Sequence, residues 1–270
     1  MSSPSTSIAL KNFIFGYGSL ICHESRIKTA PSLANVTAIP VMVENLQRMW
    51  AARIDSRRGV NAQNLMGWTA VGVSIQEGTN CNGVLLPVND DELQLFDKRE
   101  KHYKRVHVHW SLISKFGGGH FDEEMMETSN VWVYAQESTV LANRYFPIPQ
   151  SYVDVIMKGC LSISDEFCKT FIETTQGWWY EPKESDLVDL VTRLEANGEE
   201  KKVEIQDIQH LDIEDHLVWV DDRLQPGYKN SGRTILDWTE SNYHMVDEIL
   251  LRYAPVALER RRKIDIPVRG

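Results

Sequence analysis

Short apolar runs dominate the first half of the chain, and helical periodicity dominates the second. Between Phe13 and Tyr134 the apolar residues come in runs broken by turn residues, a pattern typical of β-strands. Beyond Tyr134 they recur at helical spacing, as in the amphipathic stretch from Tyr243 to Tyr253. Strands followed by helices predict an α+β protein with a mostly helical C-terminal part.

Apolar positions and turn residues place the individual elements. The expected strands include residues 13–15, 68–75 and 82–88, and the expected helices are residues 91–104, a segment through Gly159 and Cys160, 187–194 and 243–253. Residues 116–120 and 122–128 are rich in glycine and acidic residues, so we expect a long mobile insertion there, either a lid or a disordered loop. The four charges of residues 199–202 are interpreted as a solvated linker.

Length and composition indicate one main domain with an appendage. The chain has 270 residues, 42% of them hydrophobic, which is enough for a large core. We expect a disordered N-terminus at residues 1–11, a main domain at 12–178 and a C-terminal extension at 179–270 packed on it. The aromatic residues expected to bury the extension are Trp178, Trp179, Tyr180 and Trp219. Whether residues 221–223 form a clamp for a carboxylate stays open.

Charge and cysteine spacing argue against several classes of protein. A net charge of −9 disfavours nucleic acid as a partner, and the basic residues within 259–263 are interpreted as a solvated helix end. No apolar run has the length of a membrane span, and residues 1–9 lack a signal-peptide layout, so we expect a cytoplasmic protein without a membrane partner. The cysteines lack metal-ligand spacing and are expected to be reduced, with Cys160 and Cys168 on one helical face.

A Gly-Tyr-Gly turn follows the first apolar run. Gly16 and Gly18 flank Tyr17, and glycines at such positions allow left-handed backbone and close approach of a ligand to main-chain N–H groups. The turn is therefore a candidate cradle for an anion or oxyanion, with a purely structural turn as the alternative. A dinucleotide site is disfavoured, because Ile21 stands where the fingerprint needs a third small residue.

One glutamate falls on the apolar side of the helix expected at residues 91–104. Leu93, Phe96 and Tyr103 recur at spacings of three and seven, and Glu100 lies in the same stripe. An acid on an apolar face is desolvated, which raises its pKa and suits it to shuttle a proton near neutral pH. The alternative is a structural glutamate at the helix end, paired with Arg99, Lys101 or Arg105.

Two other constellations are weaker candidates for chemistry. Cys22 and His23 adjoin the glycine turn, but neighbouring residues seldom orient toward one another, so a thiol nucleophile is disfavoured. His107 and His109 alternate with apolar residues on a probable strand and, together with His102, have donors for a metal. A polar strand face explains these histidines more simply.

The glycine turn and the glutamate segment together resemble the γ-glutamylcyclotransferase family. Its members carry a Tyr-Gly-Ser-Leu-type loop after the first strand and a later Asp/Arg-Glu…Tyr segment, matched here by Tyr17–Leu20 and Asp97–Tyr103. The resemblance spans residues 13–178, and its further matching segments are 48–50, 55–59, 131–134 and 149–152. Cys22 departs from the glutathione-specific branch, which usually has tryptophan there, so the branch stays open.

The resemblance implies a mixed β-barrel with flanking helices and a specific reaction. The α-amine of a γ-glutamyl compound attacks its own γ-amide carbonyl, which releases 5-oxoproline and an amine or peptide. Glu100 would be the acid/base residue, and the loop residues Tyr17, Gly18, Ser19 and Leu20, with Tyr103, would bind the substrate. The family implies a small-molecule γ-glutamyl substrate, no metal or organic cofactor, and a monomer or homodimer. Glutathione is one of several possible substrates.

Two alternatives share the same residues. One is a binding or regulatory module that holds a small carboxylate and performs no chemistry. Glu100 argues against it, because a binder of an anionic ligand gains nothing from another negative charge. The other is an enzyme of the same fold that acts on a γ-glutamyl amine or a different amide. Fold resemblance alone does not choose between these activities.

Overall fold

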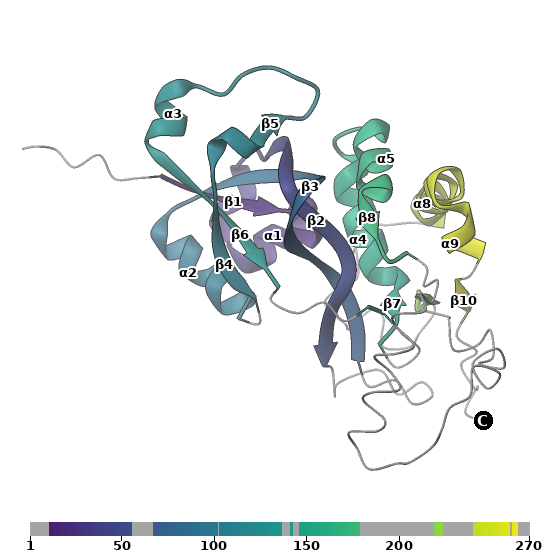
Figure 1. Cartoon of the computed structure of the whole chain (residues 1–270). Coiled ribbons are helices and arrows are strands. Elements are labelled where there is room, and N and C mark those ends of the chain that lie inside the picture. Colours follow the sequence, from purple (N-terminus) through teal and green to yellow (C-terminus); the bar gives the residue numbers. More distant parts are fainter. Residues whose placement is uncertain are drawn as a thin grey trace, which may run out of the picture.

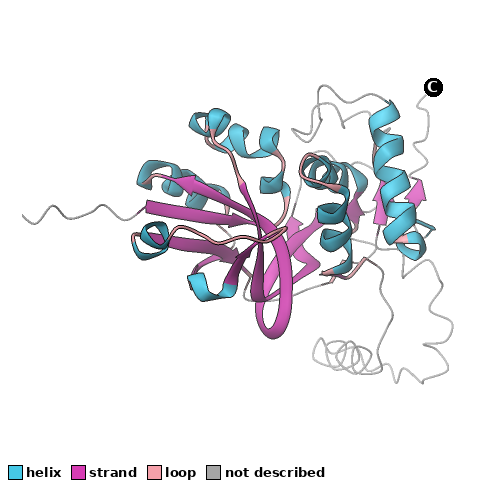
Figure 2. Ribbon diagram, turned by 90° about the horizontal axis from the view of Figure 1, so that it is seen from above, coloured by secondary structure: helices cyan, strands magenta, loops and turns pink. Residues whose placement is uncertain are grey.

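The computed structural model describes residues 11–55, 67–101, 103–136, 141–142, 146–178, 219–223, 240–259 and 261–263. A curled, mixed β-sheet forms the body of the protein, and helices flank it (Figures 1 and 2). The predicted α+β class, with a mixed, partly closed barrel and flanking helices, is therefore confirmed, and the sheet forms a curled half-barrel. The expected helix at 187–194, the linker at 199–202 and residues 1–10 lie outside the described residues.

The main sheet has seven strands in the part of the chain that the structure describes. The strands are β1 (Lys11–Gly16), β2 (Ile39–Asp55), β3 (Gly67–Val88), β4 (Lys104–Val108), β5 (Ile113–Lys115), β6 (Ser129–Ala135) and β8 (Thr175–Gln176). Their order is β4-β6-β1-β3-β2-β5, and β8 also pairs with β2. The β1–β6 and β2–β8 pairs are parallel, and the other pairs are antiparallel.

Strand β1 is central, and this position fixes the glycine turn. Its apolar residues Phe13, Ile14 and Phe15 are buried, as a strand covered on both faces requires. It pairs with β3 on one side up to Gly16 opposite Val84, and with β6 on the other. The pairing with β6 stops at Ile14, so β3 alone holds the end of β1, from which the turn leaves the sheet.

Strands β2 and β3 form a long antiparallel pair that is interrupted by a bulge of four residues. The two separate strands expected at 68–75 and 82–88 are parts of the single strand β3. Ile75 pairs with Leu46 and Asn80 with Glu44, so residues 76–79 project from the ladder opposite Asn45. Asn45 has a φ of 60° and its side chain accepts a hydrogen bond from the Gly78 N–H at 3.1 Å. The polar stretch interrupts the apolar pattern but not the strand.

The helix that precedes the candidate glutamate is shorter than expected. Helix α2 spans Asp90–Arg99 and begins with a capping box between Asn89 and Glu92. It ends because Glu100 leaves the helical conformation (φ −97°, ψ 31°) and β4 begins at Lys104, which pairs with β6. The expected end at residue 104 was wrong, since strand pairing prevails over helical periodicity there.

The remaining helices surround the sheet or follow it. The α-helices are α1 (His23–Thr29), α3 (Glu123–Glu127), α4 (Gln150–Leu161), α5 (Asp165–Glu173), α8 (Glu240–Tyr253) and α9 (Pro255–Glu259). Short 3-10 turns are η1 (Ser19–Ile21), η2 (Pro31–Asn35) and η3 (Trp110–Leu112). Cys160 and Cys168 are buried and reduced, but they come from α4 and α5 and share no single helical face.

The segment expected to be a mobile insertion contains a capped helix. Asp122 accepts a hydrogen bond from the Met125 N–H at 3.0 Å and thereby begins α3. Phe121, Met125 and Met126 pack against the hydrophobic core. The expectation of a disordered loop was wrong, because these apolar residues anchor a segment whose composition is otherwise polar, and a role as a lid stays a prediction.

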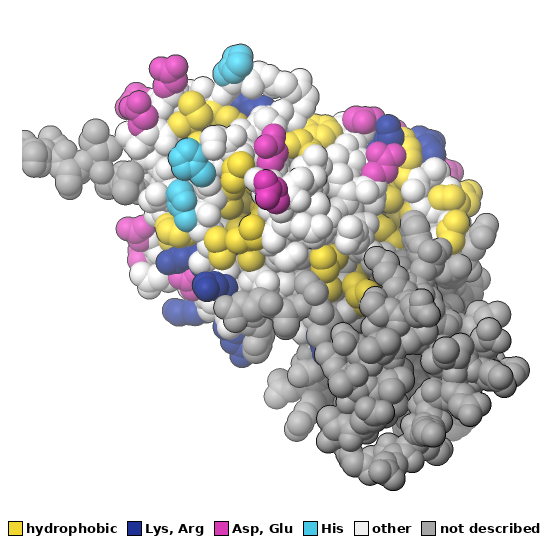
Figure 3. Space-filling view, in the orientation of Figure 1, with side chains coloured by type: hydrophobic (Ala, Val, Ile, Leu, Met, Phe, Trp, Pro, Cys, Tyr) yellow, Lys and Arg dark blue, Asp and Glu magenta, His cyan; other side chains and the backbone are white. Residues whose placement is uncertain are grey.

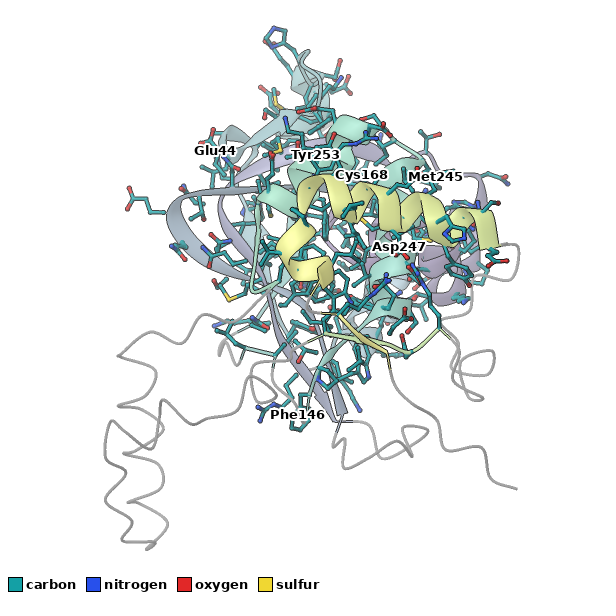
Figure 4. The ribbon with its side chains drawn as sticks, turned by 90° about the vertical axis from the view of Figure 1, so that its right-hand side faces the viewer. Glu44, Phe146, Cys168, Met245, Asp247 and Tyr253 are labelled. Carbon is teal, nitrogen blue, oxygen red and sulfur yellow. The ribbon has the colours of Figure 1, made fainter. Side chains whose placement is uncertain are left out.

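The described part of the C-terminal extension shares the core of the main domain. Strands β7 (Ile148–Pro149), β9 (Trp219–Asp221) and β10 (Arg262–Lys263) form a small parallel sheet. Helix α8 contacts α4 and α5 and buries Val246, Ile249 and Leu250. It begins three residues before the expected Tyr243. Figure 4 shows α8 crossing this side of the molecule, with Met245 and Asp247 labelled on it.

Charged residues hold the extension to α4. Arg223 donates two hydrogen bonds to the buried Asp154, at 2.6 and 2.8 Å, and also pairs with Asp247. The neighbouring Asp222 accepts hydrogen bonds from the N–H and hydroxyl of Ser151, at 2.7 and 2.6 Å. Residues 221–223, considered as a substrate clamp, thus bind protein groups, and Asp222 caps a helix whose own N-cap residue is Pro149.

Candidate functional site

The six residues predicted for the site line one pocket. It contains about 360 Å³ of unfilled space, including open solvent at its mouth. The predicted residues in its wall are Tyr17, Gly18, Ser19, Leu20, Glu100 and Tyr103. The other lining residues are Phe15, Gly16, Val71, Tyr134 and Tyr152. The turn after β1 and the segment after α2, about 80 residues apart in sequence, therefore meet where the central strand ends. Their roles in binding and catalysis stay predictions.

The loop after β1 turns without left-handed glycines. Gly18 has φ −138° and ψ −128°, and neither it nor Gly16 is among the described residues with positive φ, so that expectation was wrong. Instead η1 turns the chain, since Ile21 N–H donates to the Gly18 carbonyl at 2.9 Å. Among the described residues, no main-chain carbonyl accepts from the N–H groups of Gly18, Ser19 or Leu20. The Ser19 backbone hydrogen-bonds the Tyr152 hydroxyl, so that the N–H groups of Gly18 and Leu20 remain for side chains or a ligand.

Gly18 packs closely against the pocket wall. A Cβ placed there would lie 3.3 Å from the hydroxyl of Tyr152 and 3.3 Å from Cγ2 of Val71. The loop therefore packs closely against the pocket wall, and the predicted approach of a ligand to its main-chain N–H groups stays a prediction. A larger side chain would press on these two pocket residues.

We expect Gly18→Val to reduce the affinity for 5-oxoproline by about tenfold or more. Its branched side chain would press on Val71 and Tyr152 and obstruct the approach of a ligand. Isothermal titration calorimetry measures the effect, and Gly18→Ala, with the Cβ alone, should show a smaller loss. Melting temperatures control for unfolding. Unchanged affinity in the valine variant would mean that Gly18 only shapes a structural turn.

Glu100 is a mostly buried carboxylate with one cationic partner. It follows the last residue of α2, and its side chain is 19% exposed. Burial raises its pKa, whereas the charge and hydrogen bond of Arg99, 2.9 Å from Oε1, lower it. The ion pair with Arg99, which was one interpretation drawn from the sequence, is thus present, and Glu100 also lies in the pocket wall, where its role as a proton shuttle stays a prediction.

Four tyrosines line the pocket together with the glutamate. Tyr17 donates to the Tyr134 carbonyl at 2.6 Å, and Tyr134 donates to Asp97 at 2.8 Å. Burial raises the pKa of each pocket tyrosine, so the phenols stay protonated near neutral pH. Ser19 hydrogen-bonds the hydroxyl of Tyr152. The pocket therefore offers neutral polar groups around one acid.

Arg48 lies buried behind the loop. Its guanidinium donates to Asn82 O at 2.6 Å, to Asn82 Oδ1 at 2.8 Å and to the Tyr17 carbonyl at 3.3 Å. Its other acceptors are Phe171 O, Thr174 Oγ1 and Thr175 Oγ1. No carboxylate pairs with it among the described residues, and burial lowers its pKa to about 10. A fully buried side chain thus ties β2, β3 and α5 to the loop.

The weaker candidates for chemistry show no catalytic arrangement. Cys22 donates its thiol to Glu24 at 3.1 Å, and burial raises its pKa to about 11, which disfavours a thiolate. His107 lies on β4, whereas His109 is the N-cap of η3 and His102 lies outside the described residues. The residues that the structure describes contain no group of three His, Cys, Asp or Glu side chains able to hold a metal.

The surface charges are mixed, and the helices are those of a chain without long apolar runs. Acidic, basic and apolar side chains are interspersed on the face shown in Figure 3. In the described ranges, no helix combines the length and apolar character needed to cross a membrane.

Sequence reasoning missed Tyr134, Tyr152 and the role of Arg99. Both tyrosines lie in segments quoted for the family resemblance, but nothing in their spacing places them in the pocket. Arg99 was considered only as a partner of Glu100, yet its Nη2 also donates to Ser19 Oγ at 3.0 Å. Such a contact joins two segments distant in sequence, and a single sequence carries no signal for it.

Comparisons with known proteins give only low similarities. No family model and no curated protein matches the sequence. A human structure, described as uncharacterized protein loc79017, is 14% identical (TM-score 0.43) over 67% of this chain and 98% of its own. A gamma-glutamyl cyclotransferase structure is 14% identical (TM-score 0.42) over 68% and 99%. A yeast gamma-glutamyl cyclotransferase specific to glutathione is 13% identical (TM-score 0.33) over 77% and 93%. The function of this chain must therefore be derived from its own residues.

Proposed function

We propose that the protein is a γ-glutamylcyclotransferase. It converts a γ-glutamyl amide to 5-oxoproline and a free amine or peptide by attack of the substrate's own α-amine. The observation that carries the proposal is the meeting, in one pocket, of Glu100, a desolvated acid, with the Gly18–Leu20 loop, whose main-chain N–H groups donate to no main-chain carbonyl among the described residues. The likeness of both segments to the family's motifs supports it.

Glu100 is suited to move the proton that this reaction requires. The α-amine of the substrate is an ammonium group near neutral pH and becomes a nucleophile only when a base removes a proton. Burial raises the pKa of Glu100 toward that of a useful shuttle, while Arg99 keeps the carboxylate form accessible. The proton then passes to the leaving nitrogen as the amide C–N bond breaks and the lactam C–N bond remains. No water is consumed.

The loop after β1 is suited to bind the carbonyl oxygen that becomes negative. The N–H groups of Gly18, Ser19 and Leu20 are the donors assigned to this oxygen or to the substrate's α-carboxylate. Tyr17 and Tyr103 form polar walls beside the glutamate. Folding the substrate so that its amine meets its carbonyl supplies much of the rate, since an oriented intramolecular attack has an effective molarity on the order of 10⁵ M or more.

A set of γ-glutamyl compounds tests which class of substrate the protein converts. Purified protein is incubated with glutathione, γ-glutamyl dipeptides and ε-(γ-glutamyl)-lysine, and 5-oxoproline is quantified by mass spectrometry. We expect release from at least one of them. If the protein binds 5-oxoproline or glutamate but releases no product from any member, the non-catalytic carboxylate-binding module or an enzyme for another amide replaces this proposal.

We expect a chelator to leave turnover unchanged. Proton transfer by Glu100 and binding by main-chain N–H groups require no Lewis acid. The rate of 5-oxoproline release is measured before and after dialysis against EDTA, with a known zinc enzyme dialysed in parallel as the control. A loss of activity that zinc restores would contradict the mechanism and direct attention to His107 and His109.

A further inference from the structure

Arg99 contacts both the acid and the loop of the pocket. Its Nε lies 2.9 Å from Oε1 of Glu100, and its Nη2 donates to the hydroxyl of Ser19 at 3.0 Å. Arg99 is the last residue of α2, whereas Ser19 is the first residue of η1, so one side chain joins the two segments that form the site.

The third nitrogen of the guanidinium is anchored on α1. Nη1 donates to Thr29 Oγ1 at 2.6 Å and to the Ser25 carbonyl at 3.2 Å. All three nitrogens therefore have partners. Nε contacts Glu100, Nη2 donates to Ser19, and Nη1 donates to α1. A planar guanidinium can do this in one fixed geometry, while the ammonium of lysine is a single point donor.

We propose that Arg99 is a positioning residue that holds the Glu100 carboxylate at a fixed place relative to the Gly18–Leu20 loop. The proposal rests on the proposed function, because it concerns the same reaction. The base must reach the substrate's α-amine while the loop holds the carbonyl that the amine attacks. A misplacement of about 1 Å between such groups costs on the order of 100-fold in rate.

Arg99 also determines at which pH Glu100 is ionised. Burial raises the pKa of Glu100, and the positive charge of Arg99 lowers it. The other titratable groups that face Glu100 among the described residues are Tyr17, Tyr103 and Tyr152, and burial raises the pKa of each, so they stay neutral. Removing the charge of Arg99 therefore raises the pKa of Glu100. Since the carboxylate accepts the proton, the acid limb of the kcat/KM profile moves to higher pH.

The test compares Arg99→Met and Arg99→Lys with the wild type. Arg252→Met is the matched control, because Arg252 is an exposed arginine on α8. The pH dependence of kcat and kcat/KM is measured on the substrate that the wild type uses best, and the Glu100 carboxyl pKa is measured by ¹³C NMR. For Arg99→Met we expect kcat to fall about 100-fold and both the acid limb and the carboxyl pKa to rise by about one unit.

Arg99→Lys separates position from charge. It keeps the charge, so the acid limb should stay near that of the wild type, while kcat falls because one ammonium cannot span Glu100 and Ser19. This variant also decides the matter if Arg99→Met fails to fold. Wild-type kcat in Arg99→Lys, or an unmoved carboxyl pKa in a folded Arg99→Met, overturns the proposal. If the wild type itself releases no 5-oxoproline, the proposed function fails, and the NMR pKa still tests the Arg99–Glu100 contact.

Discussion

Glu100→Gln should lower turnover by about 10²–10⁴-fold, the range that general acid–base catalysis supplies. Glutamine keeps the size of the side chain and can still accept a hydrogen bond from Arg99, but it cannot remove a proton from the substrate's ammonium group. The affinity for the product 5-oxoproline should change less than turnover, because the loop donors are untouched. Initial rates of 5-oxoproline release and calorimetric titration with 5-oxoproline measure the two effects.

The control for this variant is Glu127→Gln, which removes an exposed carboxylate on α3. We expect its turnover to match the wild type. Equal melting temperatures of all three proteins would show that the fold is kept. Turnover of Glu100→Gln within a few-fold of the wild type would remove Glu100 from the mechanism and leave it the structural role of an Arg99 partner.

Among the variants proposed for this protein, Arg48→Met should lower the free energy of unfolding most. The Arg48 side chain is fully buried, and its removal deprives acceptors on Asn82, Phe171 and Thr174 of donors that water cannot replace. Each buried acceptor that loses its donor costs about 1–3 kcal/mol, so the loss of several at once should exceed about 2 kcal/mol. Urea denaturation followed by circular dichroism gives the free energy of unfolding. The exposed Arg252→Met should lie within about 0.5 kcal/mol of the wild type.

Arg48 also contacts the Tyr17 carbonyl, so the same variant reports on the loop. If its unfolding free energy lies within about 1 kcal/mol of the wild type, buried water or neighbouring groups replace the guanidinium, and the network does not carry the stability assigned to it. A variant that unfolds during purification would be refolded by dilution out of urea. The fraction that regains the circular dichroism of the folded state would then measure a severe loss of stability.

The sequence was informative wherever one local pattern determines the structure. The apolar run at residues 13–15 became the buried central strand β1, and the amphipathic stretch near Tyr243 became α8. The placement of Glu100 beside the glycine loop followed from the family resemblance of two short motifs. Burial on both faces of a strand, or on one face of a helix, leaves a periodicity that can be read without a structure.

The sequence was less informative where contacts between segments distant in sequence determine the structure. The expected helix at 91–104 ended at Arg99 because β4 pairs with β6, and no local residue announces that pairing. The polar residues 76–79 appeared to end a strand, yet Asn45 supports them as a bulge. Side-chain bridges such as Arg99 to Ser19 depend on the complete fold, so that part of the site was not predictable from spacing.

The most direct test of the central claim is the identity of the product formed in H₂¹⁸O. Wild-type protein and Glu100→Gln are incubated with the preferred γ-glutamyl compound, and the products are analysed by mass spectrometry. Intramolecular cyclisation predicts unlabelled 5-oxoproline with an equal amount of free amine, formed by the wild type and about 10²–10⁴-fold more slowly by the variant. Glutamate carrying ¹⁸O from the solvent would show attack by water and would contradict cyclisation in this pocket.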